Sequence, residues 1–355
     1  MKPAKVSFVI ATHGRTDALR ATLTSLVRQE HQDWTAIVVG DCCNEKTEHA
    51  IRSISDPRIK YYNLPIRCGE QSGPNSFGLS IATGDYLVYL NHDDILLSDH
   101  LSYGIDQICR KDADMFFGKY AMADSYYEKD GLVMPLFTHI LPNHQDSTFM
   151  LDPYTEGLDP SSFWIMRMQY AKRVGKWRHA ADIWRTPISD WLCRCWKQRG
   201  KFVFGEQLTG LRIHTHVARG NMNKSVPNYQ NPSPEHSVIT DYLERYSADE
   251  IRRLILNDSE ISKLAFQEQP STWHKRLHRK LHKKWRQFRH HQRRKFAGFL
   301  YQYFDIDLAE QKLRKLNVLP GQEMNELSRS RTGQGIGIAA DLLPLMDYPE
   351  IFRVI

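Results

Sequence analysis

Apolar residues in the first hundred positions form short continuous runs, separated by segments with helical spacing. The runs are rich in branched or aromatic residues at both odd and even positions, which is typical of strands buried on both faces. The predicted strands are Lys5–Ala11, Trp34–Val39, Arg58–Leu64 and Tyr86–Leu90. Between them, the spacing predicts a helix capped by Thr16 and helices over Glu45–Ile54 and Gly73–Ala82. This alternation predicts an α/β domain with a mostly parallel sheet flanked by helices.

Polar residues follow the fourth predicted strand directly. Asn91 and His92 precede two adjacent carboxylates, Asp93 and Asp94. Two neighbouring carboxylates at the end of a buried strand repel one another unless a cation or hydrogen bonds compensate. Mg²⁺ and Mn²⁺ take oxygen ligands and commonly bridge one or two carboxylates to substrate phosphates. The alternative is that Asp93 and Asp94 cap the helix that follows, because Asp is a favoured N-cap.

The ends of the predicted strands also indicate where a ligand would bind. In open parallel sheets, ligands lie beyond the carboxyl ends of the strands. Thr12, Asp41 and Asp93 all fall at such ends. We therefore expect these three residues to line one site.

Further elements of the same kind follow up to position 213. Gly200 ends a segment with helical spacing. The sequence between the first two of the later strands is irregular and polar, so no element is predicted there. The predicted helices are Leu101–Arg110 and Ile188–Arg199, and the predicted strands are Ala113–Ala121, Ser162–Met166, Lys201–Phe204 and Leu208–Ile213.

A long loop separates this region from the C-terminal part of the chain. His214–Glu235 is rich in Asn, Pro and Ser, and loops of this length are usually functional lids or disordered segments. From Ser237 onward the pattern is helical throughout. The predicted organisation is a catalytic domain over 1–216, a flexible loop or lid over 217–236 and a helical extension over 237–355.

The composition is that of an ordinary globular protein, with 41% hydrophobic and 25% charged residues in a chain of 355. No apolar run reaches the length of a transmembrane helix. The first residues lack the apolar stretch and cleavage site of a signal peptide. We therefore expect a cytoplasmic protein. The six cysteines show no zinc-site spacing, so we expect free thiols.

The net charge of +7 belongs to one segment of the chain. Between Trp273 and Phe296 there are eleven Lys or Arg residues and no acid, so the remainder is net negative. Aromatic and leucine positions within 273–300 recur at helical spacing, which predicts an amphipathic helix with one aromatic and one basic side. Such a helix suits an anionic membrane surface. The alternatives are a helix packed on the catalytic domain with solvated charges and, less suited to the aromatic side, a nucleic-acid contact.

The strand ends and loops of the N-terminal part, taken in their order along the chain, resemble glycosyltransferase family 2, whose members have the GT-A fold. The resemblance covers roughly residues 5–215 and is specific as an ordered set. It implies an inverting, metal-dependent transferase that takes a sugar from a nucleotide-diphosphate donor. The stretches that carry it are Val6–Arg15, Val38–Asp41, Gln71–Leu79 and Ala82–Asp94.

The resemblance implies roles for the residues at matching positions. Asp93 would hold Mn²⁺ or Mg²⁺ on the diphosphate, with Asp94 beside it. Asn91 stands where the family more often has Asp, which removes one potential anionic ligand. Asp41 matches an acid that typically meets the base or ribose. The expected residues around the donor nucleotide are Thr12, Arg15, Asp41, Asn75 and Asn91.

Inverting transfer also needs a base that takes the proton of the acceptor hydroxyl. Asp190, near the start of the predicted helix 188–199, matches the family's base, and N-capping is the alternative role. His214 falls where related enzymes often place a histidine that touches the metal or diphosphate, and imidazole is an acceptable Mn²⁺ ligand. A surface histidine at a strand end is the alternative there.

Together these features predict a glycosyltransferase at the inner face of a membrane. It would move a sugar from a nucleotide-diphosphate donor to a glycan or lipid-linked acceptor in surface polysaccharide synthesis. A nucleotidyltransferase is an alternative, but the loop Thr12–Arg15 lacks the Gly-rich pattern normal for that class. A catalytically inactive GT-A-like scaffold is the second alternative, motivated by Asn91 and by Ser189 beside Asp190.

Overall fold

The structure is a computed structural model that describes residues 4–129, 132–141, 147–151, 160–213, 234–265, 295–304, 307–315 and 319–321. His214, almost all of the predicted loop 217–236 and the basic segment up to residue 294 lie outside the described residues. Predictions on these parts stay predictions.

One nine-stranded sheet runs through the molecule in the order β3-β2-β1-β4-β8-β6-β9-β5, with β7 paired to β6. Parallel pairing joins the first four strands, which confirms the parallel sheet predicted for the N-terminal half. These are β1 (Val6–Thr12), β2 (Trp34–Gly40), β3 (Ile59–Asn63) and β4 (Tyr86–Tyr89). From β8 onward the pairing is mixed. The later strands are β5 (Asp94–Leu96), β6 (Met115–Lys129), β7 (Leu132–Leu141), β8 (Trp164–Arg167) and β9 (Phe202–Ile213).

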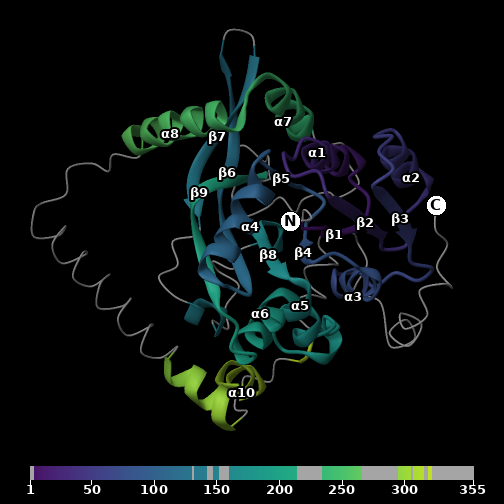
Figure 1. The fold of residues 1–355 in the computed structure, drawn as a ribbon, viewed down its shortest axis with the longest axis vertical. Coiled ribbons are helices and arrows are strands. Elements are labelled where there is room, and N and C mark those ends of the chain that lie inside the picture. Colours follow the sequence, from purple (N-terminus) through teal and green to yellow (C-terminus); the bar gives the residue numbers. More distant parts are fainter. Residues whose placement is uncertain are drawn as a thin grey trace, which may run out of the picture.

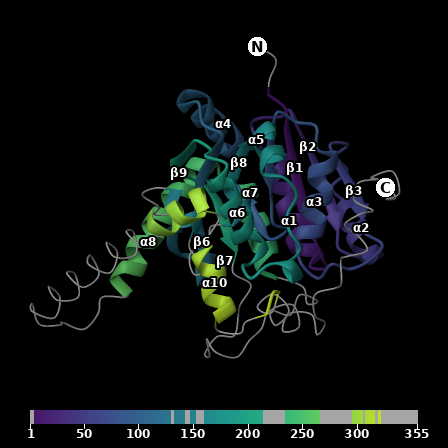
Figure 2. The ribbon, with the colours of Figure 1, turned by 90° about the horizontal axis from the view of Figure 1, so that it is seen from below.

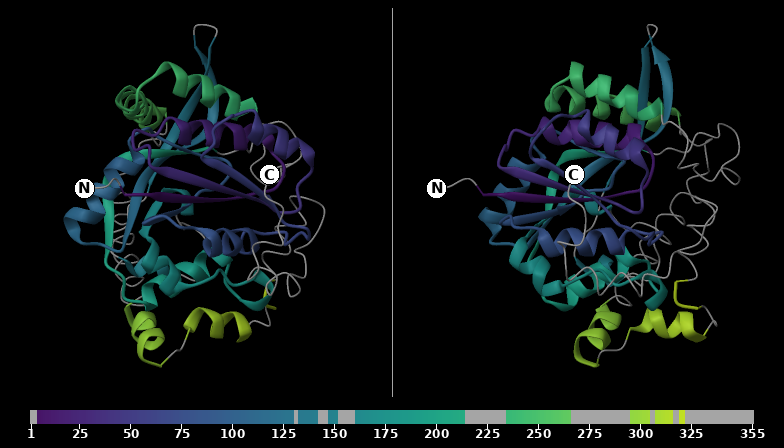
Figure 3. Two further views of the ribbon diagram at one scale, coloured as in Figure 1. Left: turned by 45° about the vertical axis from the view of Figure 1, so that its right-hand side comes forward. Right: turned by 90° about the vertical axis from the view of Figure 1, so that its right-hand side faces the viewer.

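Helices cover both faces of the sheet (Figure 1 and, from the side, Figure 3). Side chains alternate across a strand, so β1 sends Phe8 to one face and Val9 to the other. Phe8 packs in a core with α1 (Thr16–Val27), α2 (Glu45–Arg52) and α4 (His100–Lys111). Val9 packs in a core with α3 (Ser72–Ile81), α5 (Met168–Val174) and α6 (Pro187–Lys197). Short 3₁₀ turns are η1 (Ser147–Leu151), η2 (Ser161–Phe163) and η3 (Ala180–Asp182).

Three local predictions were wrong. Arg15, rather than Thr16, occupies the N-cap of α1. The region predicted as irregular contains β7, which pairs with the extended β6 as a hairpin that projects from the domain in Figure 1. β7 contains Pro135, which lowers the strand signal but is tolerated on an edge strand. The two short strands predicted over 201–213 are one strand, β9.

Two groups of helices follow the sheet, in line with the predicted helical extension. α7 (Pro234–Arg245) and α8 (Ala248–Ala265) bury apolar residues such as Ile239 and Ile255 against the region of β5 and β9. A helical stretch over 295–304 and α10 (Leu308–Lys315) lie beside α6 at the opposite end, as Figures 1 and 2 show. Among the described residues, the helices include none both long and apolar enough to cross a bilayer.

Gly78 of α3 lies so close to Val9 of β1 that a larger side chain at position 78 should lower stability. A Cβ atom on Gly78 would collide with Cγ1 of Val9 and lie 2.8 Å from its Cγ2. We expect Gly78→Ala to lower the free energy of unfolding by about 1–3 kcal/mol, because overpacking a rigid core forces side chains from their rotamers. Ser80→Ala, at an exposed position of the same helix, serves as the control and should change stability by less than about 0.5 kcal/mol. Urea unfolding measures both, and equal stability of the two variants would contradict the packing described.

Candidate active site

The carboxyl ends of β1 and β2 meet at one edge of the sheet. Thr12 is the register partner of Gly40, and the Asp41 amide donates to the Thr12 carbonyl at 2.8 Å. The Asp41 carboxylate is buried and accepts hydrogen bonds from the amides of Cys68 and Gly69 at 2.6 and 2.8 Å. Burial raises the pKa of Asp41, and the two amide donors oppose that shift. Asp41 therefore fixes the loop that follows β3 at the sheet edge.

Arg15 joins the loop after β1 to the end of β4. Its guanidinium NH1 donates to Oδ2 of Asp93 at 2.8 Å, with the Arg15 side chain buried and that of Asp93 26% exposed. Arg15 holds this position in the left-handed region (φ 50°), after Gly14 at φ 63°. For a non-glycine residue that conformation costs about 1–2 kcal/mol, which the charge-assisted bond and the packing of α1 offset. Two of the predicted site residues are thus in direct contact.

Asp94 differs from its neighbour in both burial and partners. Its Oδ2 accepts from the Asn91 amide group at 2.9 Å and from the Ser162 hydroxyl at 2.5 Å. Burial and the nearby Asp93 raise the pKa of Asp94 to about 6, and Arg212 on the paired strand β9 opposes the shift. Asp94 begins β5 instead of a helix, so the N-capping alternative was wrong for this pair. Asp94 and Asn91 support the end of β4 from inside, while Asp93 reaches solvent.

The side chains at this edge of the sheet include one possible ligand for a divalent cation. Among the described residues, no group of three His, Cys, Asp or Glu side chains is placed to share a metal ion. Asp93 offers one partly exposed carboxylate, a hard oxygen ligand suited to Mg²⁺ or Mn²⁺. Mg²⁺ is commonly held by one or two carboxylates together with substrate phosphates. The residues therefore fit a cation shared with a bound diphosphate.

Asp190 lies in the first turn of α6, but Thr186 is the N-cap and Pro187 follows it. The N-capping alternative for Asp190 was therefore wrong. Its buried carboxylate is held by two arginines instead. Oδ2 accepts from Nε of Arg178 at 3.1 Å and from Nε of Arg194 at 3.0 Å, and a second Arg178 nitrogen bonds Oδ1. Arg194 is anchored further by the carbonyls of Val174 and Lys176, at 2.7 and 2.8 Å, whereas the Arg178 side chain is 54% exposed.

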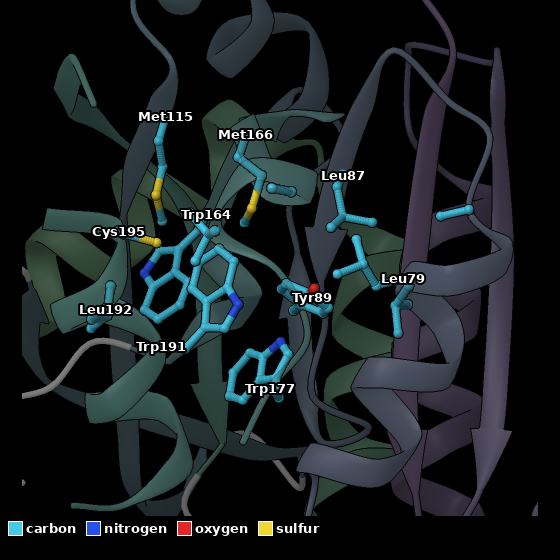
Figure 4. Packing of buried hydrophobic residues seen from close by; sticks show 14 of the residues in the cluster. Leu79, Leu87, Tyr89, Met115, Trp164, Met166, Trp177, Trp191, Leu192 and Cys195 are labelled. Carbon is cyan, nitrogen blue, oxygen red and sulfur yellow. The ribbon is translucent and has the colours of Figure 1, made fainter. Parts of the chain in front are cut away.

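Aromatic packing connects the start of α6 to the end of β4 (Figure 4). Trp191 stacks on Trp177 with ring centroids 5.6 Å apart and on Trp164 at 6.3 Å. Tyr89 of β4 meets Trp177 and Trp191 edge to face, at 5.1 and 5.5 Å. All four rings are almost fully buried. The residue after Asp190 is therefore packed against the strand that leads to Asn91 and Asp93.

A further buried acid, Glu70, joins the loop after β3 to the segment before α6. Its carboxylate accepts from the Ser72 amide at 2.6 Å and from the Ala180 amide at 3.4 Å. His179 Nε2 lies 3.7 Å from Oε1, and its Nδ1 accepts from the Ala181 amide at 3.2 Å. That bond assigns the proton of the neutral ring to Nε2, facing Glu70. Asn75, which the sequence predicted to lie near the donor nucleotide, is buried in the first turn of α3 nearby.

Several residues of this region carry no signal in the linear sequence. Ser162 is 68 positions from Asp94, and Glu70 is 110 positions from its Ala180 partner. Arg178 and Arg194 flank Asp190 at distances of 12 and 4 positions, but only the helical i,i+4 spacing of Arg194 gives a usable signal. The structure brings Arg15, Asn91, Asp93 and Asp94 together.

Comparison with known proteins identifies the domain. Residues 7–175 match the model described as Glycosyl transferase family 2. The Escherichia coli enzyme WfgD, a UDP-Glc:alpha-D-GlcNAc-diphosphoundecaprenol beta-1,3-glucosyltransferase, is 22% identical over 34% of this chain and 47% of its own length. The Campylobacter jejuni GalNAc(5)-diNAcBac-PP-undecaprenol beta-1,3-glucosyltransferase is 32% identical over 28% and 32%. The matched part thus spans less than half of either relative.

A solved structure has a similar outline. Staphylococcus aureus TarS 1–349 in complex with UDP-GlcNAc superposes with a TM-score of 0.49 and 12% identity, covering 98% of this chain and 87% of that one. At this score the likeness adds nothing to the assignment, which depends on the domain match.

Glu70 gives the site a pH-dependent stability that can be measured. Burial raises the pKa of its carboxyl from 4.5 to about 7. The folded protein then binds this proton more tightly than the unfolded chain, so the stabilisation is complete below about pH 4.5 and is lost as the pH rises through about 7. At about 1.4 kcal/mol per pKa unit, roughly 3 kcal/mol is at stake.

We expect the unfolding free energy of the wild type, relative to Glu70→Gln, to fall by about that amount between pH 4.5 and 8. The comparison with a variant is needed because burial lowers the pKa of His179, which makes stability rise with pH in both proteins. Exposed Glu206→Gln is the matched control and should show no pH-dependent difference. A difference between wild type and Glu70→Gln that is constant with pH would contradict the assignment.

Proposed function

We propose that this chain, in which residues 7–175 form a glycosyltransferase family 2 domain, transfers a sugar from a nucleotide-diphosphate donor to a glycan or lipid-linked acceptor in surface polysaccharide synthesis. The observation that carries the proposal is the Arg15–Asp93 pair at the end of β4, on the sheet edge that also holds Asp41. Both relatives are glucosyltransferases that act on undecaprenol-diphosphate-linked sugars, which supports this acceptor class.

Arg15 and Asp93 have complementary tasks toward the donor. The planar guanidinium of Arg15 matches the geometry of phosphate oxygens and can donate to them in pairs. Asp93, 26% exposed, would hold a Mn²⁺ or Mg²⁺ ion from the protein side. Such a cation, when bound, offsets the charge that develops on the leaving diphosphate. Asp41 keeps the loop at Cys68 and Gly69 in place beside them.

Asp190 would accept the proton of the acceptor hydroxyl as that oxygen attacks the anomeric carbon, which is the base role of an inverting single displacement. One of its arginine contacts must give way for this. Arg178 is the contact that solvent or acceptor can replace, because its side chain is 54% exposed. Arg194 is held by two backbone carbonyls and keeps the carboxylate oriented. The aromatic packing of Trp191 on Tyr89 fixes this helix relative to β4.

A catalytically inactive scaffold is the second candidate. The observation in its favour is that both carboxylate oxygens of Asp190 bond arginines.

We further propose that the protein works at the cytoplasmic face of a membrane. The relatives with lipid-linked substrates and the basic sequence between Trp273 and Phe296 support this localisation.

Turnover measurements separate an enzyme from a scaffold. We expect Asp190→Asn to lower kcat by about 10²–10⁴-fold with a similar KM for the donor, because it removes only the proton acceptor. Asp93→Ala should raise the donor KM as well as lower kcat, because it removes the ligand of the diphosphate-bound ion. Asp106→Asn, which alters a side chain that is 41% exposed on α4, is the control and should behave like the wild type.

The assay is release of nucleoside diphosphate from a panel of nucleotide sugars in the presence of Mn²⁺. No turnover by the wild type with any donor would favour the scaffold. Turnover that survives unchanged in Asp93→Ala would reject the role given to that residue.

A further inference from the structure

The helical stretch 295–304 exposes a row of aromatic side chains. Phe296, Phe299 and Tyr303 follow the i, i+3, i+7 spacing of one helix face, and Phe304 adjoins it. Their exposed fractions are 59%, 51%, 64% and 60%, respectively. Leu308 and Leu319, in the segments that follow, are also exposed. Large exposed apolar patches of this kind mark surfaces that bind protein or membrane.

The opposite face of the same stretch is docked on the catalytic domain. A Cβ atom on Gly298 would lie 2.8 Å from Leu151 and from the Trp196 ring of α6, so this glycine permits close approach. The ammonium of Lys197 lies 4.7 Å from the centre of the Tyr301 ring. Because these contacts fix the inner face, the row of aromatic residues is held outward.

An ion pair and a cation–π contact strengthen this attachment near the proposed base. Arg185 donates to both oxygens of Asp307 at 2.8 Å, and its side chain is only 6% exposed. The guanidinium of Arg314 in α10 lies over the Trp184 ring at 4.1 Å. The segment just before α6 is therefore bound to residues 307–315. The aromatic face and the helix of Asp190 belong to one packed unit.

Described cations adjoin the aromatic face. Lys295 precedes Phe296 in the chain, and the Arg199 guanidinium lies 5.9 Å from the centre of the Tyr303 ring. Two of the acids that follow in the sequence are ion-paired, Asp307 with Arg185 and Glu310 with Arg314, and Asp305 lies outside the described residues. The sequence that leads into this stretch adds ten further Lys or Arg residues from Lys275 to Arg294 and no acid. Aromatic rings that directly follow a densely basic sequence suit an anionic lipid surface.

We propose that the face formed by Phe296, Phe299, Tyr303 and Phe304 docks on an anionic lipid bilayer and turns the α6 side of the domain toward it. The rings enter the headgroup boundary while the surrounding cations pair with lipid phosphates. This orientation brings the helix of Asp190 toward the surface on which a lipid-linked acceptor lies. The orientation toward an acceptor depends on the proposed function, whereas bilayer docking itself does not.

Vesicle binding without donor or acceptor tests the docking surface. The probes are vesicles of phosphatidylglycerol with phosphatidylcholine and vesicles of phosphatidylcholine alone. Co-sedimentation measures how much of the full chain binds to each. We expect the wild type to bind the anionic vesicles, with binding weakened by salt. A triple variant, Phe296→Ser, Phe299→Ser and Phe304→Ser, should bind at least tenfold more weakly. Leu256→Ser, which alters a 55% exposed residue on α8, should bind like the wild type.

Phe299→Trp guards against a folding defect, because it keeps an interfacial ring and should bind at least as tightly as the wild type. The proposal would be overturned if the wild type did not bind anionic vesicles, or if the triple variant bound them as tightly as the wild type. The proposal would also be overturned if the wild type formed a dimer and did not bind vesicles while the triple variant stayed monomeric. The face would then bind a second copy of the chain. Because the assay contains no substrate, its failure leaves the transferase proposal standing.

Discussion

Parallel hydrogen bonding of β1 with β2 and β4 is the constraint on which the site depends. It sets the carboxyl ends of three strands at one edge, so that Thr12, Asp41 and the residues after Leu90 become neighbours although Thr12 and Asp94 are 82 positions apart. These strands are buried on both faces, and a register slip would turn core side chains such as Phe8 and Val9 to the wrong sides. The cost of that slip keeps the polar residues at the strand ends in register.

Three further attachments extend this order beyond the edge. The pair of Arg15 and Asp93 connects the loop after β1 with the end of β4, and Glu70 connects the loop after β3 with the segment before α6. The cluster of Tyr89, Trp177 and Trp191 joins α6 to the same strand. The proposed donor and acceptor sides therefore share one rigid core. Of the two arginines that bond Asp190 in the described residues, Arg178 is the more exposed, at 54% against 17%, which makes it the contact better able to move.

The sequence predicted the first four strands, the helices between them and the approximate place of Asp93, because these features depend on local apolar runs and strand ends. It did not predict β5 or the hairpin of β6 and β7, whose formation depends on pairing with distant strands. It also missed Ser162 and Arg178, since their contacts with Asp94 and Asp190 arise only when the chain folds back on itself. The N-capping alternatives for Asp94 and Asp190 were reasonable from residue type alone. Tertiary contacts, rather than local preference, decided both.

The claim that the tip of β4 binds a cation-bridged diphosphate can be tested most directly by crystallography. Crystals of the full chain soaked with Mn²⁺ and a nucleoside diphosphate would be measured at the manganese absorption edge. The account predicts an anomalous peak about 2 Å from an Asp93 oxygen, with Arg15 turned toward the diphosphate and Asp94 still bonded to Asn91 and Ser162. A nucleotide bound elsewhere, with Asp93 still paired to Arg15 and no manganese beside it, would contradict the account.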